Sequence, residues 1–198
     1  MGAHENLEHA EHAEHASHSN KKIALLISVL ALFLAFSETL GKSAQTAAIA
    51  DNIKASDTWN FFQAKTVRQT TLRAAAEGLA VQLPTVTNEE SRAAIAKQIE
   101  NWRNTVARYE SDPKEKDGRK ELRAMAEKLE HERDTWLAKY HQYEFASAAF
   151  QIGIVLASAA VITSIVTLAW VAGLAGVLGL GFMALGLLVP HALHLAGH

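Results

Sequence analysis

Residues 145–189 read FASAAFQIGIVLASAAVITSIVTLAWVAGLAGVLGLGFMALGLLV, and this stretch decides the fold. It contains 45 residues and no charged side chain. A single helix of that length would measure about 67 Å, roughly twice the thickness of a bilayer core. The stretch must therefore fold back on itself. We expect the turn at Trp170–Gly176, where an interfacial tryptophan meets two glycines.

A second apolar stretch begins at Ile23, directly after Lys21 and Lys22. Extended to Leu40, it would form roughly 27 Å of helix, which nearly spans a bilayer core. The 20 residues before it are acidic, unlike the short basic start of a signal peptide, so we interpret it as an uncleaved transmembrane helix. The sequence thus predicts three transmembrane helices, at about 22–41, 146–169 and 174–190.

The charged residues lie outside the C-terminal apolar stretch. All 19 Lys/Arg and all 21 Asp/Glu of the 198 residues fall within residues 1–144. A water-soluble globule cannot expose 54 uncharged residues, so a soluble enzyme is excluded. Because the chain has no cysteine, disulfides, thiolate metal sites and cysteine nucleophiles are excluded too. The net charge of −2 gives no reason to expect a nucleic-acid partner.

The charged block between the apolar stretches, residues 42–144, predicts a helical stalk. It holds 17 Lys/Arg, 16 Asp/Glu and two prolines. Thr87 and Glu90 have the spacing of a capping box, and Gly118 ends a turn. We therefore expect helices at 42–83, 88–111 and 119–144. Apolar residues recur along the second and third of these at coiled-coil spacing, namely Ile95, Ile99, Trp102, Val106 and Tyr109, then Leu122, Met125, Leu129, Trp136, Tyr140 and Tyr143.

The stalk has to return the chain to the membrane face from which it started. Neither proline nor glycine occurs between Arg119 and Gln151, so the third stalk helix should continue into the second span. The first span should likewise continue through Gly41. The two shorter helices, about 36 and 39 Å long, together match the long one of about 63 Å, so we expect both to run back along it. A break at Ser56-Asp57 leaves a four-helix alternative open.

The predicted fold is therefore an all-α membrane protein with three transmembrane helices and a long, coiled-coil-like extramembrane hairpin. Its expected divisions are an acidic His-rich tail (1–20), a first transmembrane helix (21–41), the stalk (42–144), a transmembrane hairpin (145–190) and a C-terminal tail (191–198). Small residues recur every four positions in the hairpin, which allows close helix packing either within one chain or between subunits. These small residues are Ala149, Gly153 and Ala157, the pair Ala172 and Gly176, and the pair Ala175 and Gly179.

Few residues suggest chemistry. Glu38 is the one acid in an apolar span, and Lys42 follows at the favourable i+4 spacing, so we expect a paired interfacial carboxylate, with an ion or proton site as the alternative. The long stalk helix carries a polar stretch that either fixes the register of a coiled coil or lines a pore. The sequence assigns no catalytic, cofactor-binding or metal-binding residue and has no phosphate loop or nucleophile elbow. The polar stretch consists of Gln63, Thr66, Gln69 and Thr70, and Thr163, Ser164 and Thr167 add hydroxyls to the second span.

The N-terminal tail repeats Glu-His-Ala three times. As a helix it would place glutamates and histidines at i,i+4, pairs that attract only when the imidazoles are protonated. Neutral imidazoles also bind zinc, nickel or copper. A plain solvated tail, a metal-binding tail and a pH-sensing tail all stay open. The histidines concerned are His9, His12, His15 and His18, and three more end the chain at His191, His194 and His198.

Several of these residues also resemble a known family. The start of the first span, IALLI from Ile23, the segment Ser56-Asp57-Thr58-Trp59, the segment Phe62-Gln63-Ala64-Lys65 and the closing apolar hairpin are similar to the bacterial domain of unknown function family 4337. The resemblance covers nearly the whole chain. It implies a small integral membrane protein of bacterial type, and it brings no activity and no catalytic residue.

We expect a homo-oligomeric structural or interaction scaffold in a bacterial inner membrane, with the lipid bilayer, other copies and a protein bound through the stalk as partners. A small channel or transporter subunit is one alternative, and a metal- or pH-responsive sensor that uses the tail is another. An enzyme is not expected. Basic residues near the spans favour a cytoplasmic stalk. Those on the stalk side are Lys42, Lys54, Lys128, Arg133 and Lys139, against Lys21 and Lys22 on the other.

Overall fold

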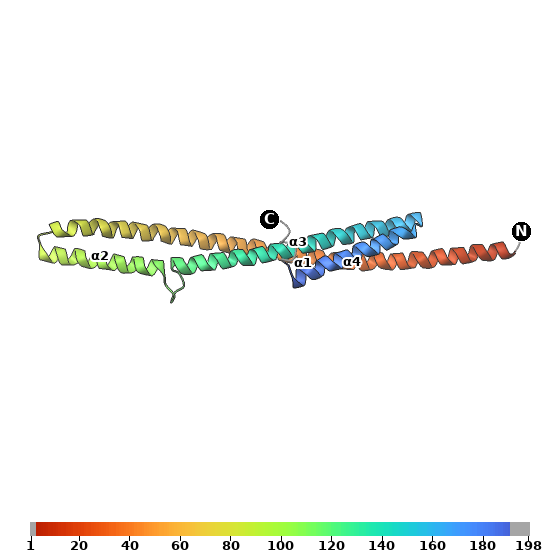
Figure 1. Ribbon diagram of the computed structural model, residues 1–198, viewed down its shortest axis with the longest axis horizontal. Helices are drawn as coiled ribbons and strands as arrows, with labels where there is room; N and C mark the ends of the chain where they lie inside the picture. The colour runs from red at the N-terminus through yellow and green to blue at the C-terminus, as the bar shows by residue number, and fades with distance from the viewer. Residues whose placement is uncertain (1–2, 191–198) are drawn as a thin grey trace. The chain divides into compact units, whose positions relative to one another are not determined.

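The computed structural model describes the backbone of residues 3–190 and the side chains of residues 21–190. It contains two compact units, in which residues 49–133 form the charged unit and the described residues before and after them form the apolar unit. In chain order the elements are α1 (Ala3–Gln82), the short 3-10 helix η1 (Leu83–Thr85), α2 (Glu89–Glu110), α3 (Arg119–Thr163) and α4 (Val166–Leu188) (Figure 1).

The predicted continuous helices are confirmed. Helix α1 runs through Gly41 without a break, and α3 begins at Arg119 and ends only at Thr163. The four-helix alternative is wrong, because α1 is not interrupted at Ser56-Asp57. The hydroxyl of the next residue, Thr58, donates to the carbonyl of Lys54 at 2.7 Å, so the polar side chain bonds within the helix and does not cap a new one.

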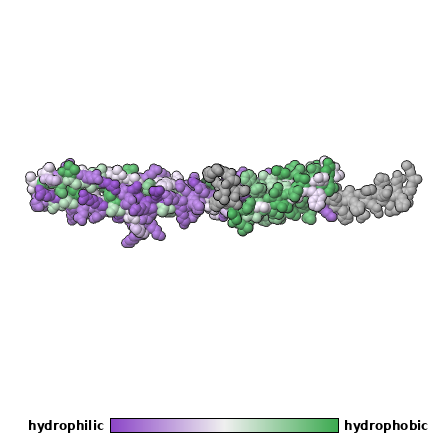
Figure 2. Space-filling model, viewed as in Figure 1, coloured by the Kyte–Doolittle hydropathy of each residue, from purple (hydrophilic) through white to green (hydrophobic). Residues whose placement is uncertain are grey.

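Helices α1, α3 and α4 of the described chain are long and apolar enough to cross a membrane. On the face that Figure 2 shows, apolar residues predominate on the apolar unit and hydrophilic residues on the charged unit. Leu25, Val155 and Val177, one from each helix, are 66, 66 and 65% exposed. Such outward aliphatic side chains suit a lipid environment, in which their exposure carries no hydrophobic penalty.

Glycines bring the three apolar helices into close contact. A Cβ on Gly153 would lie 3.1 Å from Cδ1 of Leu30, and a Cβ on Gly176 would lie 2.6 Å from its Cδ2. A Cβ on Gly179 would lie 2.7 Å from the ring of the fully buried Phe150. These glycines leave room for large side chains of their own chain. The interpretation of these glycines as internal packing residues is therefore confirmed.

The turn between α3 and α4 lies at Ser164 and Ile165, so its predicted position at Trp170–Gly176 is wrong. Ser164 has a φ of 57°, and the amide of Ile165 donates to the hydroxyl of Thr163 at 3.4 Å. Short polar side chains of this kind tolerate and support a tight turn. The glycines of the predicted turn lie inside α4, where Gly176 serves packing rather than a change of direction.

The first turn of α2 differs from the predicted capping box. Asn88 is the N-cap residue, and its side-chain oxygen accepts a hydrogen bond of 2.9 Å from the amide of Ser91. Asparagine caps at least as well as threonine, so the cap forms one residue later than Thr87. Before this cap, α1 ends at Gln82 and is followed by the 3-10 helix η1 (Leu83–Thr85), which contains Pro84.

In the charged unit, α2 and α3 run back along α1 in the predicted order. Gln69 of α1 bonds to Val106 and Glu110 of α2. On α3, Arg119 bonds to Thr66, the carboxylate of Glu130 accepts from Trp59, and Arg133 donates to Asn52. Positions on α1 thus fall as positions on α2 and α3 rise, which is an antiparallel course.

Replacing Gly179 with alanine should destabilise the apolar unit by about 1–3 kcal/mol, because the new methyl group overlaps the rigid Phe150 ring. Gly181→Ala is the matched control on the same helix. A Cβ there meets nothing within 4 Å, so it should be neutral or stabilising by up to about 1 kcal/mol. Thermal unfolding of both full-length variants in detergent measures the difference, and equal melting temperatures would contradict the packing described.

Candidate functional site

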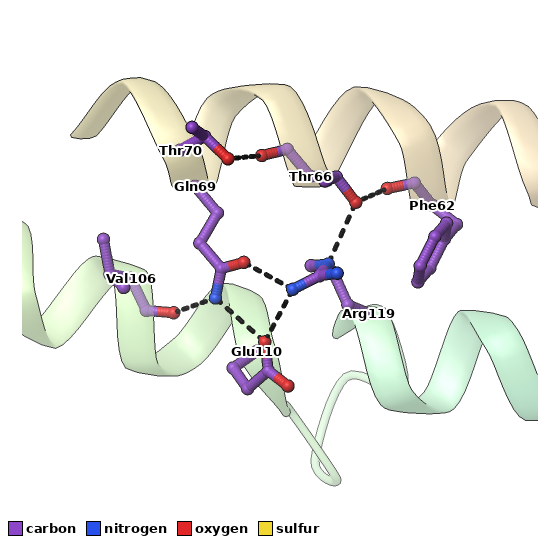
Figure 3. Close-up of polar contacts among 7 residues, drawn as sticks. All are labelled: Phe62, Thr66, Gln69, Thr70, Val106, Glu110 and Arg119. Carbon is purple, nitrogen blue, oxygen red and sulfur yellow. Dashed lines mark hydrogen bonds and ion pairs between the residues drawn. The ribbon is translucent and has the colours of Figure 1, made fainter. Parts of the chain in front are cut away.

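Three helices of the charged unit meet at a polar cluster that we call the Arg119 junction (Figure 3). Because α1 is unbroken, Phe62, Thr66 and Gln69 lie on one face of it, four and three residues apart. Glu110 is the last residue of α2 and Arg119 the first of α3. The loop between them, residues 111–118, brings these oppositely charged ends to the same face of α1.

The guanidinium of Arg119 binds both other helices. Its Nε donates to the hydroxyl of Thr66 at 2.9 Å. Its Nη1 donates to the side-chain oxygen of Gln69 at 2.7 Å and to the carboxylate of Glu110 at 2.9 Å. The group also lies 5.1 Å from the centroid of the Phe62 ring, a cation–π distance. A planar guanidinium supplies several donors in fixed directions, which a lysine ammonium cannot reproduce.

Gln69 is the buried centre of the junction, with 3% of its surface exposed. Its amide nitrogen donates to the carbonyl of Val106 at 3.2 Å and to Glu110 at 3.0 Å, while its oxygen accepts from Arg119. A buried amide is costly unless it is hydrogen-bonded, and this one is bonded at both ends. The junction therefore stabilises one alignment of α1 with α2 and α3.

The polar stretch predicted on the long stalk helix is divided by the structure. Thr66 and Gln69 face the other helices and bind Arg119, whereas Gln63 and Thr70 are exposed. The hydroxyl of Thr70 donates to the backbone carbonyl of Thr66. Sequence reasoning missed Arg119 because its partners are 50 and 53 residues away in the chain. One feature of the sequence did point to Arg119, namely that it directly follows Gly118 and is the first residue of a predicted helix.

The electrostatics of the junction favour an ionised Glu110. The hydrogen bond from Gln69, followed by the positive charges of Arg119 and Lys120, holds the pKa of the Glu110 carboxyl below its ordinary value, although partial desolvation opposes this. The group is therefore an acceptor at neutral pH. The arrangement satisfies these charges within the protein and joins the three helices.

The 111–118 loop is fixed at both ends. The Glu121 carboxylate accepts from the hydroxyl of Ser111 at 2.6 Å and from the amide of Asp112 at 3.1 Å, and the Ser111 bond is the main cause of its lowered pKa. A Cβ on Gly118 would lie 2.4 Å from the Asp112 amide nitrogen, so only glycine fits there. Lys65 of α1 forms an ion pair of 2.6 Å with Asp117.

Glu38 lines an open groove of about 330 Å³ in the apolar unit, between α1 and α3. Its carboxylate accepts a long hydrogen bond of 3.5 Å from the side chain of Gln151. Glu38 thus bonds to a residue of α3. The expected ion pair between Glu38 and Lys42 does not form among the described side chains. Ser37, next to it, is fully buried and donates to the backbone carbonyl of Tyr143 at 2.9 Å.

The tail histidines fall outside the described side chains. The interpretations of these residues as metal ligands or pH sensors therefore stay predictions. They concern His9, His12, His15 and His18, together with His191, His194 and His198.

The described chain is an all-helical protein with three helices apolar enough to cross a membrane and a charged unit whose helices are joined by partly buried hydrogen bonds. The chain belongs to the family described as Domain of unknown function (DUF4337), whose model matches residues 19–189. The resemblance inferred from the sequence is thereby confirmed. No curated protein and no solved structure matches the chain.

Arg119→Gln should weaken the junction by about 2 kcal/mol, because it removes a charge-assisted donor and leaves Gln69 incompletely bonded. Hydrogen exchange in the C-terminal half of α2 should then quicken by roughly 30-fold in the full-length protein. Arg119→Lys should restore only part of the protection. Arg123→Gln, which breaks an exposed ion pair with Glu127 one turn along α3, should change it little. Equal effects of Arg119→Gln and Arg123→Gln would contradict the assigned role.

The junction should also respond to acid. A folded-state pKa below the ordinary value means that ionised Glu110 contributes stability above the unfolded pKa, near 4.5, and that this contribution is lost as the pH falls through the lower folded value. Denaturant unfolding between pH 7 and pH 3 should therefore show a smaller acid-induced loss for Glu110→Gln than for the unmodified protein. Glu127→Gln is the control, and its acid profile should follow that of the unmodified protein.

Proposed function

We propose that this chain is a structural or interaction protein of a bacterial inner membrane, anchored by α1, α3 and α4, whose coiled-coil-like charged unit binds other copies of the chain or a protein partner. The observation that carries the proposal is the Arg119 junction. The polar side chains that sequence reasoning offered for a pore or a site, Thr66 and Gln69, are used there to hold three helices in register. A rigid helical unit of this kind suits binding rather than catalysis.

The distribution of basic residues supports a cytoplasmic charged unit. Five lysines and arginines near the apolar helices lie on the side of that unit, and only Lys21 and Lys22 precede the first apolar stretch. Cytoplasmic segments next to membrane helices carry an excess of such residues. The partners that follow are the lipid bilayer, further copies and a cytoplasmic protein. The proposal includes no enzyme activity, cofactor or nucleic acid.

Self-association is the part of this proposal that a single measurement tests. The mass of the full-length protein in a mild detergent, at micromolar concentration, should correspond to more than one copy after the detergent is subtracted. Light scattering or native mass spectrometry gives this value. A strictly monomeric species under these conditions would contradict the proposal, and an oligomer with a hydrated central path along α1 would favour the channel alternative instead.

A further inference from the structure

Helix α1 carries an exposed face in the charged unit that is free of charge over its whole length. Ten residues spaced three or four apart make up this outer stripe, and every one of them is exposed. Such spacing keeps side chains on one side of a helix. The opposite side of α1, with Ala55, Thr58, Gln69 and Ala76, is buried against α2 and α3. The outer stripe consists of Ile49, Ile53, Ser56, Asn60, Gln63, Val67, Thr71, Ala74, Gly78 and Val81.

The stripe exposes aliphatic side chains on a unit whose surface, on the face that Figure 2 shows, is mostly hydrophilic. Ile49 and Ile53 are each 56% exposed, Val67 64% and Val81 78%. These positions lie after the apolar stretch 23–40, among charged residues of α1 such as Asp51, Lys54 and Arg68. An exposed row of uncharged residues that includes such aliphatic side chains, on a water-facing unit, is characteristic of a surface that another protein covers.

Gly78 supplies an independent observation on the same stripe. A Cβ on this residue would meet nothing within 4 Å, so no neighbour in its own chain requires a glycine. Glycine inside a helix is unfavourable compared with alanine. At Gly118, Gly153, Gly176 and Gly179, by contrast, atoms of the chain itself fill the space, whereas Gly173 and Gly181 of the apolar α4 are open like Gly78. Close approach by a helix from outside the chain would account for Gly78.

We propose that the outer stripe of α1 binds the same stripe of a second copy, with the two helices parallel and in register. This inference rests on the proposed function and names the surface for self-association. Copies inserted alike in one membrane have the same direction, so a two-fold axis along the helices places each stripe residue beside its own counterpart. The uncharged stripe then creates no like-charge pair at any position.

The amides of the stripe favour a second copy over an unrelated partner. Asn60 and Gln63 each carry a donor and an acceptor, so each is satisfied by the same residue of the other copy. A shift by one turn would place Gln63 of one copy opposite Val67 of the other, and a polar pair in such a seam fixes the alignment. A stripe about 50 Å long and 10 Å wide would bury about 1,000 Å² in total, which is enough for a specific interface.

Disulfide trapping tests the contact, since the natural chain has no cysteine. Ile53→Cys, Val67→Cys and Val81→Cys, made singly in the full-length protein, should each give a cross-linked dimer when membranes are oxidised with copper phenanthroline. A parallel in-register pair brings all three within the 7 Å that a disulfide allows between Cα atoms. Lys97→Cys on α2 and Glu127→Cys on α3 are exposed controls and should stay monomeric.

The pattern of cross-links decides the proposal. An antiparallel pair would link at most one of the three positions and would overturn it, as would equal linking of the controls. If the unmodified protein is an oligomer but none of the three positions links, the stripe is wrong and the proposed function stands. A monomeric unmodified protein would overturn both.

A charge placed on the stripe gives a second readout that does not depend on cysteine chemistry. Val67→Lys should halve the mass measured in detergent while leaving the helix content unchanged, because two lysines would face each other across the two-fold axis. Ala124→Lys, on the exposed surface of α3, should keep the original mass. Retention of the full mass by Val67→Lys would contradict the proposal.

Discussion

A polypeptide backbone surrounded by apolar groups must satisfy its hydrogen bonds within its own segment, and this requirement organises the molecule. It makes the apolar stretches helical, and two of these helices continue without a break into the charged unit as α1 and α3. Because α1 is one unbroken helix, the spacing of its residues decides which of them share a face. Thr66 and Gln69 can meet Arg119 together because, three positions apart in an unbroken helix, they lie on the same face of α1.

The two units hold their helices together by opposite means. In the apolar unit, side chains are removed, and Gly153, Gly176 and Gly179 let neighbouring helices approach closely. Dispersion contacts at short range are what stabilise helix pairs where the surroundings are as apolar as the side chains. In the charged unit, long polar side chains are added, and Arg119 reaches two other helices at once. Water competes for hydrogen bonds there, so burial of Gln69 and several simultaneous bonds are needed.

Much of the fold could be predicted from local pattern, because the absence of proline and glycine and the apolar spacing act over a few turns. The continuous α3 and the order of the stalk helices follow from such signals and from length. The turn between α3 and α4 could not be placed, since Gly176 looks like a turn residue in sequence and is a packing residue in space. The sequence indicated Thr66 and Gln69 as polar residues of the long helix but not their partner Arg119, because that contact depends on the alignment of residues about 50 positions apart.

Leu30 has a mechanical consequence for the apolar unit. Its side chain fills the space above Gly153 of α3 and Gly176 of α4, and only Ser164 and Ile165 connect those two helices. Shifting α3 along α1 by one turn, about 5.4 Å, would set an alanine methyl group where Leu30 now fits. Leu30 thus opposes movement of α3 and α4 along the axis of α1. Force on this unit should tilt or rotate its three helices together rather than ratchet one past another.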